Sequence, residues 1–152
     1  MAYWLFKTEP DVFSINDLHA RGADGEVWDG VRNYQARNFM RDQAKIGDKV
    51  FIYHSSCKHV GIAGIASIIE TQVIDPSQFD QTSQYFDEKS TQDEPRWICV
   101  KVAFEQKLPR LISLQRLKAH PDLVDMPLLK KGSRLSVMPI SAEHWQAILA
   151  MA

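Results

Sequence analysis

The chain has little of what secreted and membrane-spanning proteins need. Its 152 residues include two cysteines, Cys57 and Cys99, which are too few for a disulfide framework and are typical of a reducing compartment. No apolar run approaches the roughly 20 residues that span a bilayer. Because residues 1–4 already have the character of a strand, we expect no signal or transit peptide. These absences predict a cytoplasmic protein, or a nuclear one if the source is eukaryotic, with no membrane partner.

Motifs for nucleotide cofactors are also missing. The chain has no phosphate-binding glycine loop, dinucleotide fingerprint or kinase motif, so we predict no cofactor and no nucleotide-driven chemistry. Its net charge is −1, which argues against a protein that coats nucleic acid without selectivity.

The charges are distributed unevenly along the chain. Residues 70–94 contain seven acids and one base, whereas residues 96–134 contain nine bases and three acids. Residues 28–58 have a smaller basic excess, with six bases and three acids. This order is compatible with one positive and one negative face, and equally with a mixed surface, because sequence segments do not map simply onto faces.

Length and composition fit one globular domain, residues 1–152. Hydrophobic residues make up 45% and charged residues 24%, which is the usual balance of a folded protein. About five strands alternate irregularly with short capped helices, which favours an α+β mixed barrel over a doubly wound parallel sheet. The predicted strands are 3–8, 49–54, 60–74, 96–104 and 134–140, and the predicted helices are 14–20, 33–44, 113–120 and one that begins after Ser141. Gly61 and Gly64 predict a bulge or a close backbone approach.

Aromatic, amide and cationic side chains are concentrated in two segments, residues 28–39 (WDGVRNYQARNF) and 51–56 (FIYHSS). A pocket that stacks a flat polar ligand needs Trp or Tyr faces, polar groups that read the ligand's edge, and a cation for a nearby phosphate. The same residues also fit an amphipathic helix with a solvated polar face. Spacing alone does not separate these two interpretations.

Five blocks of the sequence resemble signature segments of EVE-domain proteins. They are YWLFKTEP at 3–10, WDGVRNYQARN at 28–38, FIYHSS at 51–56, PRW at 95–97 and SRLSV at 133–137. The blocks occur in the family's order and span nearly the whole chain. The resemblance implies an α+β fold of the PUA-like group, a mixed β pseudobarrel of about five strands with short flanking helices. Relatives in that group bind nucleic acid, several of them by taking a modified base into a pocket.

From this resemblance we expect a non-enzymatic nucleic-acid-binding module that recognises a modified base in an aromatic-lined pocket. The expected partner is DNA that contains a modified cytosine, and the identity of the base comes wholly from the resemblance. Modified RNA is the nearest alternative partner. We expect the protein to be a monomer.

Four candidate ligand-binding residues lie in or beside the second and fourth blocks. Trp28 stands at a loop-to-helix junction beside Gly30, so we expect it to offer its face to the ligand rather than to the core. Arg32 and Asn33 begin the predicted helix, whose free N–H groups favour anions, and Asn33 suits the helix cap equally well. Trp97 fits the core and the pocket wall about equally.

Four further candidates lie on two strands. Lys7 interrupts an aromatic strand and faces either the pocket mouth or solvent. Tyr53, His54 and Ser55 end another strand and are suited to hydrogen bonds with a base edge.

The acidic segment 78–94 carries the last candidate, Tyr85. A loop of this length inside a compact domain is usually functional or disordered. Because its carboxylates would repel phosphate, we expect the segment to form one edge of the pocket, with Tyr85 as a lid that is mobile without ligand.

Cys57 supports a competing interpretation, a small hydrolase or a zinc site that uses His54 or His59. A structural zinc site usually needs four ligands from paired motifs, and Cys99 is the only other thiol. No glycine elbow, carboxylate pair or triad pattern surrounds Cys57. We therefore predict no catalytic residue and no metal ligand.

Overall fold

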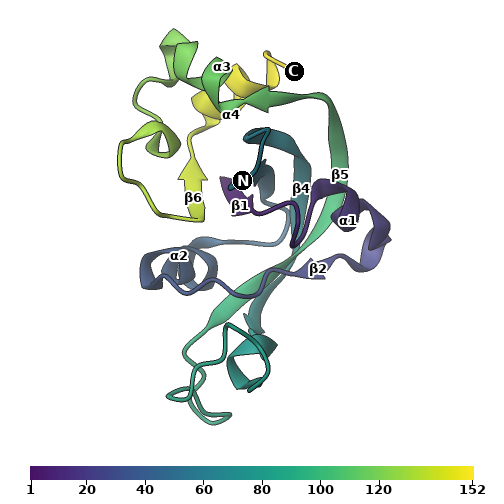
Figure 1. Cartoon of the computed structure of the whole chain (residues 1–152), viewed down its shortest axis with the longest axis vertical. Helices are drawn as coiled ribbons and strands as arrows, with labels where there is room; N and C mark the ends of the chain where they lie inside the picture. Colours follow the sequence, from purple (N-terminus) through teal and green to yellow (C-terminus); the bar gives the residue numbers. More distant parts are fainter.

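The computed structural model describes residues 1–152, which build one six-stranded mixed sheet surrounded by short helices (Figure 1). The strands lie side by side in the order β2-β5-β4-β3-β1-β6. β1 and β3 are parallel, and all other neighbouring strands are antiparallel. The strand bounds are Tyr3–Thr8 (β1), Glu26–Val27 (β2), Lys49–His54 (β3), Gly61–Ile74 (β4), Ile98–Ser113 (β5) and Val137–Ile140 (β6).

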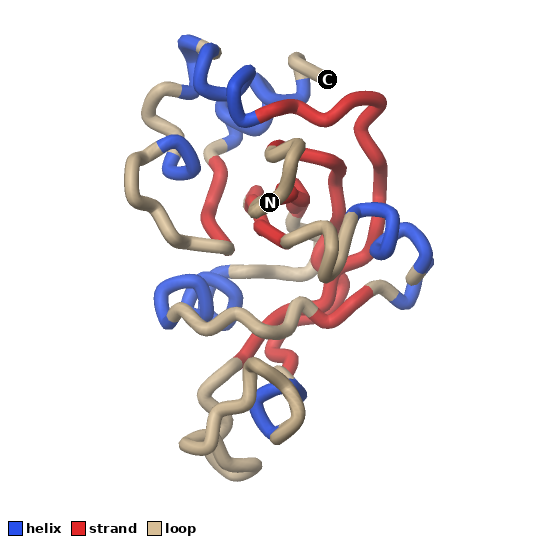
Figure 2. Tube along the Cα trace, viewed as in Figure 1, coloured by secondary structure: helices blue, strands red, loops and turns tan.

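The two longest strands, β4 and β5, give the sheet its curvature. Their pairing shifts register at four places, and each shift increases the local bend and twist. Glycine permits the close approach: a Cβ on Gly61 would lie 2.3 Å from the carbonyl oxygen of Ile112, and one on Gly64 would lie 2.6 Å from that of Gln106. The prediction of a bulge or close approach at these glycines is confirmed. Figure 2 shows the strands curling around the centre of the molecule.

Hydrophobic side chains cover both faces of the sheet. Successive residues of a strand point to opposite sides, so a continuous apolar run supplies both faces. On β1, Trp4 and Phe6 belong to a cluster of 18 buried residues, the first core, whereas Leu5 belongs to a cluster of 15, the second core. On β3, Ile52 lies in the first core and Phe51 in the second. The central strands are therefore buried on both sides.

Short helices cover the two cores. α1 and α2 contribute buried residues to the first core, and α3 and α4 contribute to the second. Each helix begins after a side chain that accepts a hydrogen bond from a backbone amide: Ser14, Asn33, Ser113 and Ser141. The helix bounds are Ile15–Ala20 (α1), Tyr34–Asn38 (α2) with a π-helical turn at Phe39–Gln43, Leu114–Ala119 (α3) and Ala142–Leu149 (α4), and short 3₁₀ turns occupy Gly22–Asp24, Pro76–Phe79, Pro121–Leu123 and Pro127–Leu129.

β4 and β5 extend beyond the other strands and lead into a lobe, residues 75–97, at the lower end of Figure 1. Gln78 is fully buried inside the lobe. Its Nε2 donates to the carbonyl oxygens of Asp75 and Trp97, and its Oε1 accepts from the Ser90 hydroxyl and the Trp97 amide. One buried amide therefore organises a segment that has little regular secondary structure. The mobility expected of residues 78–94 stays a prediction.

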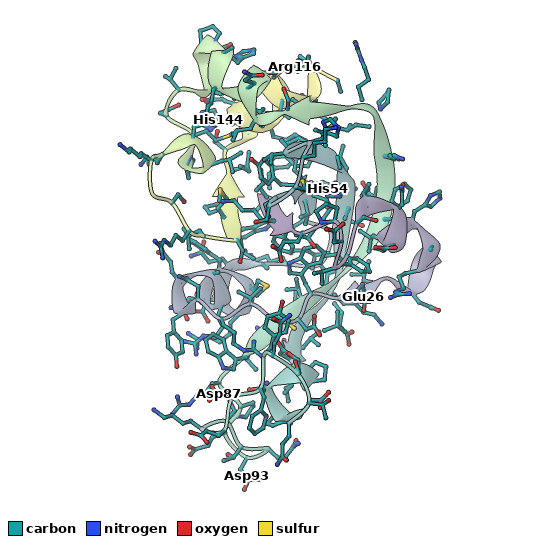
Figure 3. The ribbon with its side chains drawn as sticks, viewed as in Figure 1. Glu26, His54, Asp87, Asp93, Arg116 and His144 are labelled. Carbon is teal, nitrogen blue, oxygen red and sulfur yellow. The ribbon has the colours of Figure 1, made fainter.

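Ionisable side chains mark opposite ends of the molecule. Figure 3 shows Asp87 and Asp93 in the lobe and Arg116 and His144 at the other end. The acidic segment thus projects away from the helices α3 and α4.

The structure adds one strand to the predicted set. β2 is only two residues long, Glu26 and Val27, and pairs with Val102 and Lys101 of β5, so it is too short to give an alternating pattern. The structure also extends β5 to Ser113, past the predicted end at residue 104. No helix has the length and apolarity that crossing a membrane requires.

Candidate functional site

A cavity of about 590 Å³ lies where the end of β1, the loop after β2 and the β3–β4 loop meet. Tyr85 from the lobe and the segment before β6 complete its wall. Six predicted site residues line the cavity: Lys7, Trp28, Arg32, Asn33, Ser55 and Tyr85. The structure does not bring Tyr53, His54 and Trp97 into it.

Trp28 belongs to the wall of the cavity and to the first core at once. Its side chain is buried, with 7% of the residue exposed, and its ring centroid lies 5.5 Å from that of Phe6 and 6.2 Å from that of Phe13. Its backbone N–H donates to the carbonyl of Val100, which ties the loop to β5. The expectation that Trp28 stays out of the core is wrong, because the junction lies directly over the apolar face of β1, and its contact with a ligand stays a prediction.

A partly buried ion pair fixes the loop that follows Trp28. The carboxylate of Asp75 accepts from the backbone N–H of Gly30 at 2.9 Å and from the Arg32 guanidinium at 3.0 Å. Arg32 also donates to the Ser77 hydroxyl and twice to the Tyr85 carbonyl, at 2.9 and 2.7 Å. These partners occupy the planar guanidinium of Arg32. The side chain is therefore better suited to holding the loop and the lobe in place than to binding a phosphate.

Tyr85 packs directly on the backbone of Gly30. A Cβ at Gly30 would lie 2.7 Å from the Tyr85 ring, and Gly30 has a φ of +79°, so both space and conformation require glycine here. The Arg32 guanidinium carbon lies 5.7 Å from the centroid of the same ring. The lobe therefore brings an aromatic side chain to the cavity, which agrees with the expectation that this segment forms one edge of the pocket.

Trp97 lies beside the cavity wall in a stack of aromatic and cationic groups. Its ring stacks on Tyr34 with centroids 4.8 Å apart, and the Arg32 guanidinium lies 4.9 Å from its centroid. Its indole N–H donates to Asp87 at 2.7 Å, and this bond lowers the pKa of that carboxyl. Trp97 is buried, does not line the cavity and belongs to neither the first nor the second core, and its contact with a ligand stays a prediction.

Tyr53 and His54 also act inside the fold. Tyr53 is buried in the second core, and burial, with a smaller effect of Cys57, raises its pKa to about 12. The Nε2 of His54 accepts from the Ile15 amide at 3.1 Å, and burial, followed by Lys107, lowers the His54 pKa. Neither residue lines the cavity, and their contact with a base edge stays a prediction.

Asn33 and Lys7 line the cavity and each has a second contact. The Asn33 Oδ1 accepts from the Ala36 amide at 2.9 Å, so the cap predicted from the sequence is present. The Lys7 ammonium lies 5.9 Å from the centroid of the Tyr53 ring, and burial lowers its pKa. Ser55 lines the cavity from the β3–β4 loop, and its N–H donates to the carbonyl of Thr8.

The family model of the EVE domain matches residues 2–151. The chain belongs to the EVE domain family. Thymocyte nuclear protein 1 of Danio rerio is 41% identical, over 97% of this chain and 71% of its own length. The human protein of that name is 37% identical, over 99% of this chain and 73% of its own length.

Solved structures agree with this EVE domain over almost its full length. A protein from Pseudomonas syringae is 49% identical with a TM-score of 0.94, and the match covers 99% of both chains. Human THYN1, solved in complex with DNA that contains 5-methylcytosine, is 38% identical with a TM-score of 0.93, and the match covers 99% of this chain and 97% of that one. An ASCH protein from Zymomonas mobilis, 11% identical with a TM-score of 0.58, shares the fold. The predicted family and the PUA-like α+β fold are confirmed.

Asp29 and Arg134 are among the wall residues of this EVE domain that were not predicted. Asp29 follows Trp28 in the second block, and burial, with smaller effects of Asp75 and Glu26, raises its pKa. Arg134 is exposed, lines the cavity and takes part in no ion pair. Both lie inside blocks that carry the family resemblance, which was the available signal.

Cys57 does not line the cavity of this EVE domain. Its thiol donates to the carbonyl of His59 at 3.5 Å and contacts neither imidazole as a hydrogen-bond partner. The other thiol, Cys99, is buried, and burial followed by Asp75 and Asp29 raises its pKa. No group of three or more His, Cys, Asp or Glu side chains is arranged to hold a metal ion.

Proposed function

We propose that this EVE domain is a non-enzymatic module that binds DNA and accepts a modified cytosine in the cavity beside Trp28. The observation that carries the proposal is the human relative with 5-methylcytosine DNA, which shares 38% identity and a TM-score of 0.93 with this chain. Family membership over residues 2–151 supports carrying the function across.

The dimensions and lining of the cavity suit one extruded base. Its volume of about 590 Å³ lies within the range of small-molecule sites. Trp28 and Tyr85 supply aromatic surface, and Val12 and Phe13 supply an apolar corner for a methyl group. Extruding a base costs a few kcal/mol, and stacking on an aromatic side chain returns about 1–3 kcal/mol. We therefore expect modest affinity that depends on further contacts with the DNA backbone.

Arg134 and Lys7 are the cations best suited to those backbone contacts. Both line the cavity, and neither forms an ion pair within the protein. The lobe carries the acidic excess of the chain, so a phosphate backbone would pass along the side that bears Arg134 rather than along the lobe. Binding that uses such contacts weakens as salt rises.

A panel of oligonucleotides tests the proposal. Fluorescence anisotropy would compare duplexes that differ at one position, which holds cytosine, 5-methylcytosine, 5-hydroxymethylcytosine or N6-methyladenine, with an RNA of the same sequence that contains 5-methylcytosine. We expect a duplex with modified cytosine to bind most tightly. Equal affinity for cytosine and its modified forms would contradict the proposal, and tighter binding of the modified RNA would replace DNA with RNA as the partner.

Cys57→Ser separates the binding module from a thiol-dependent hydrolase. Serine nearly preserves the volume of cysteine, so DNA binding should be unchanged. A hydrolytic activity of the native protein that Cys57→Ser abolishes would overturn the non-enzymatic proposal.

We further propose a monomer that resides in the cytoplasm, or in the nucleus of a eukaryote, and has no membrane partner. Size-exclusion chromatography with light scattering tests the monomeric state.

A further inference from the structure

Asp29 is one of two carboxylates in the cavity wall, the other being Glu9, that have no ion-pair partner. The neighbouring carboxylates are occupied: Asp75 holds Gly30 and Arg32, and Glu26 is paired with an arginine at 2.7 Å. Asp29 therefore retains hydrogen-bond acceptor capacity that the fold does not use.

The backbone on both sides of Asp29 is fixed. Its own N–H donates to the carbonyl of Val27 at 3.0 Å, and the N–H of Trp28 donates to Val100 at 2.9 Å. On the other side, the N–H of Gly30 donates to the buried Asp75. A side chain on such an anchored loop needs little ordering when a ligand arrives, so a contact made there contributes more to affinity and selectivity.

The surroundings of Asp29 favour a ligand that donates a hydrogen bond. Asp29 is exposed, yet partial desolvation and the charges of Asp75 and Glu26 raise its pKa more than its own backbone N–H and Arg32 lower it. A carboxylate in a partly desolvated site with negative neighbours gains when a polar N–H approaches it.

Cytosine and thymine differ at the edge that such a carboxylate would meet. Cytosine presents an amino group on C4, which donates to a carboxylate, whereas thymine presents a carbonyl oxygen at the same position, which a carboxylate repels. 5-Methylcytosine and thymine carry the same methyl group on C5. A pocket that senses only the methyl group therefore cannot distinguish these two bases.

We propose that Asp29 reads the C4 edge of the bound base, accepting a hydrogen bond from the amino group of 5-methylcytosine and excluding thymine. This inference rests on the proposed function and deepens it, because it names the residue that makes the site selective for a methylated cytosine over its deamination product. Asp29 acts here as a specificity-determining contact in the wall of the cavity.

The test compares 5-methylcytosine with thymine in duplexes where each base faces an abasic site, so that neither base loses a pairing partner on extrusion. Affinities are measured above neutral pH for the native protein, Asp29→Asn and Asp11→Asn. Asp11 is exposed and lies outside the cavity, so its variant controls for the loss of one negative charge. We expect the native protein and Asp11→Asn to prefer 5-methylcytosine by about ten-fold, the range of one well-formed base-edge contact.

Asp29→Asn should bind both duplexes with nearly equal affinity, because its amide can turn either its oxygen to an amino group or its NH₂ to a carbonyl. Asp29→Ser, whose hydroxyl also donates and accepts, should behave in the same way and replaces Asp29→Asn if that variant does not fold. A full native preference in the folded Asp29 variants would overturn the role of Asp29 and leave the proposed function intact. A native protein that binds cytosine and 5-methylcytosine equally would instead contradict the proposed function itself.

Discussion

The two faces of the sheet are built from similar apolar residues and are closed in different ways. On the second core, α4 seals the face: the Trp145 ring stacks on Phe51 at 3.7 Å and on Tyr3 at 4.7 Å between centroids. On the other side of the sheet, the first core ends at the cavity. The loop that follows Trp28 lines this cavity and is held by the ion pair of Arg32 and Asp75. Apolar side chains pack closely and leave few voids, which is why α4 can seal the second core. At the cavity, a polar network holds the loop backbone in place instead, and a hollow persists.

The largest expected effects come from a matched pair of tryptophans, Trp145→Ala and Trp28→Ala. Both side chains are buried, so each truncation should lower the free energy of unfolding by about 3–5 kcal/mol. Only Trp28 lines the cavity. Denaturant unfolding measures the stability, and titration of the folded fraction with 5-methylcytosine DNA should show lost binding for Trp28→Ala alone. Equal loss of binding in both variants would mean that the second core also shapes the site.

Arg32→Ala tests whether the polar network keeps the cavity open. Removing the guanidinium leaves the buried carboxylate of Asp75 without its cation, which should cost about 2 kcal/mol of unfolding free energy or more. Binding should weaken because Tyr85 loses its anchor, while the salt dependence of the remaining binding stays unchanged. Arg32→Lys should not rescue the loss, since an ammonium cannot reproduce the planar fork. A flatter salt dependence in Arg32→Ala would instead identify a phosphate contact.

Tyr85→Ala removes the aromatic side chain that the lobe brings to the cavity. Because this side chain holds a bound base rather than steering its approach, the dissociation rate should rise by about ten-fold with little change in the association rate. Stopped-flow fluorescence measures both rates. Limited proteolysis of residues 78–94 with and without DNA supplies the second readout, and protection by ligand is expected. Native dissociation together with unchanged proteolysis would show that the lobe is not a lid.

Arg134→Ala should have the smallest effect. The side chain is exposed and has no partner within the protein, so stability should not change. If Arg134 neutralises one phosphate, the slope of log affinity against log salt should fall by about one unit. Titrations at several salt concentrations measure that slope, and an unaltered slope would remove Arg134 from the DNA contact.

Much of the fold was predictable because its signals are local. Aromatic and β-branched runs marked β1, β3 and β4, and serine caps marked the starts of α1, α3 and α4. β2 was missed because two residues carry no periodicity, and its pairing with β5 depends on residues more than 70 positions away. Of the site, six of the nine predicted residues line the cavity, and Tyr53, His54 and Trp97 do not.

The sequence by itself determined the family, most of the order of the elements and several of the segments that meet at the cavity, because these depend on motifs, periodicity and caps within a few residues. Only the tertiary structure decided which side chains the cavity receives. Arg32 finds its partners Asp75 and Tyr85 at separations of 43 and 53 residues, and these contacts make it a structural cation while Arg134 stays free. A long-range contact leaves no local pattern in the sequence. The sequence therefore could not show which cation is used inside the protein and which one is available to a ligand.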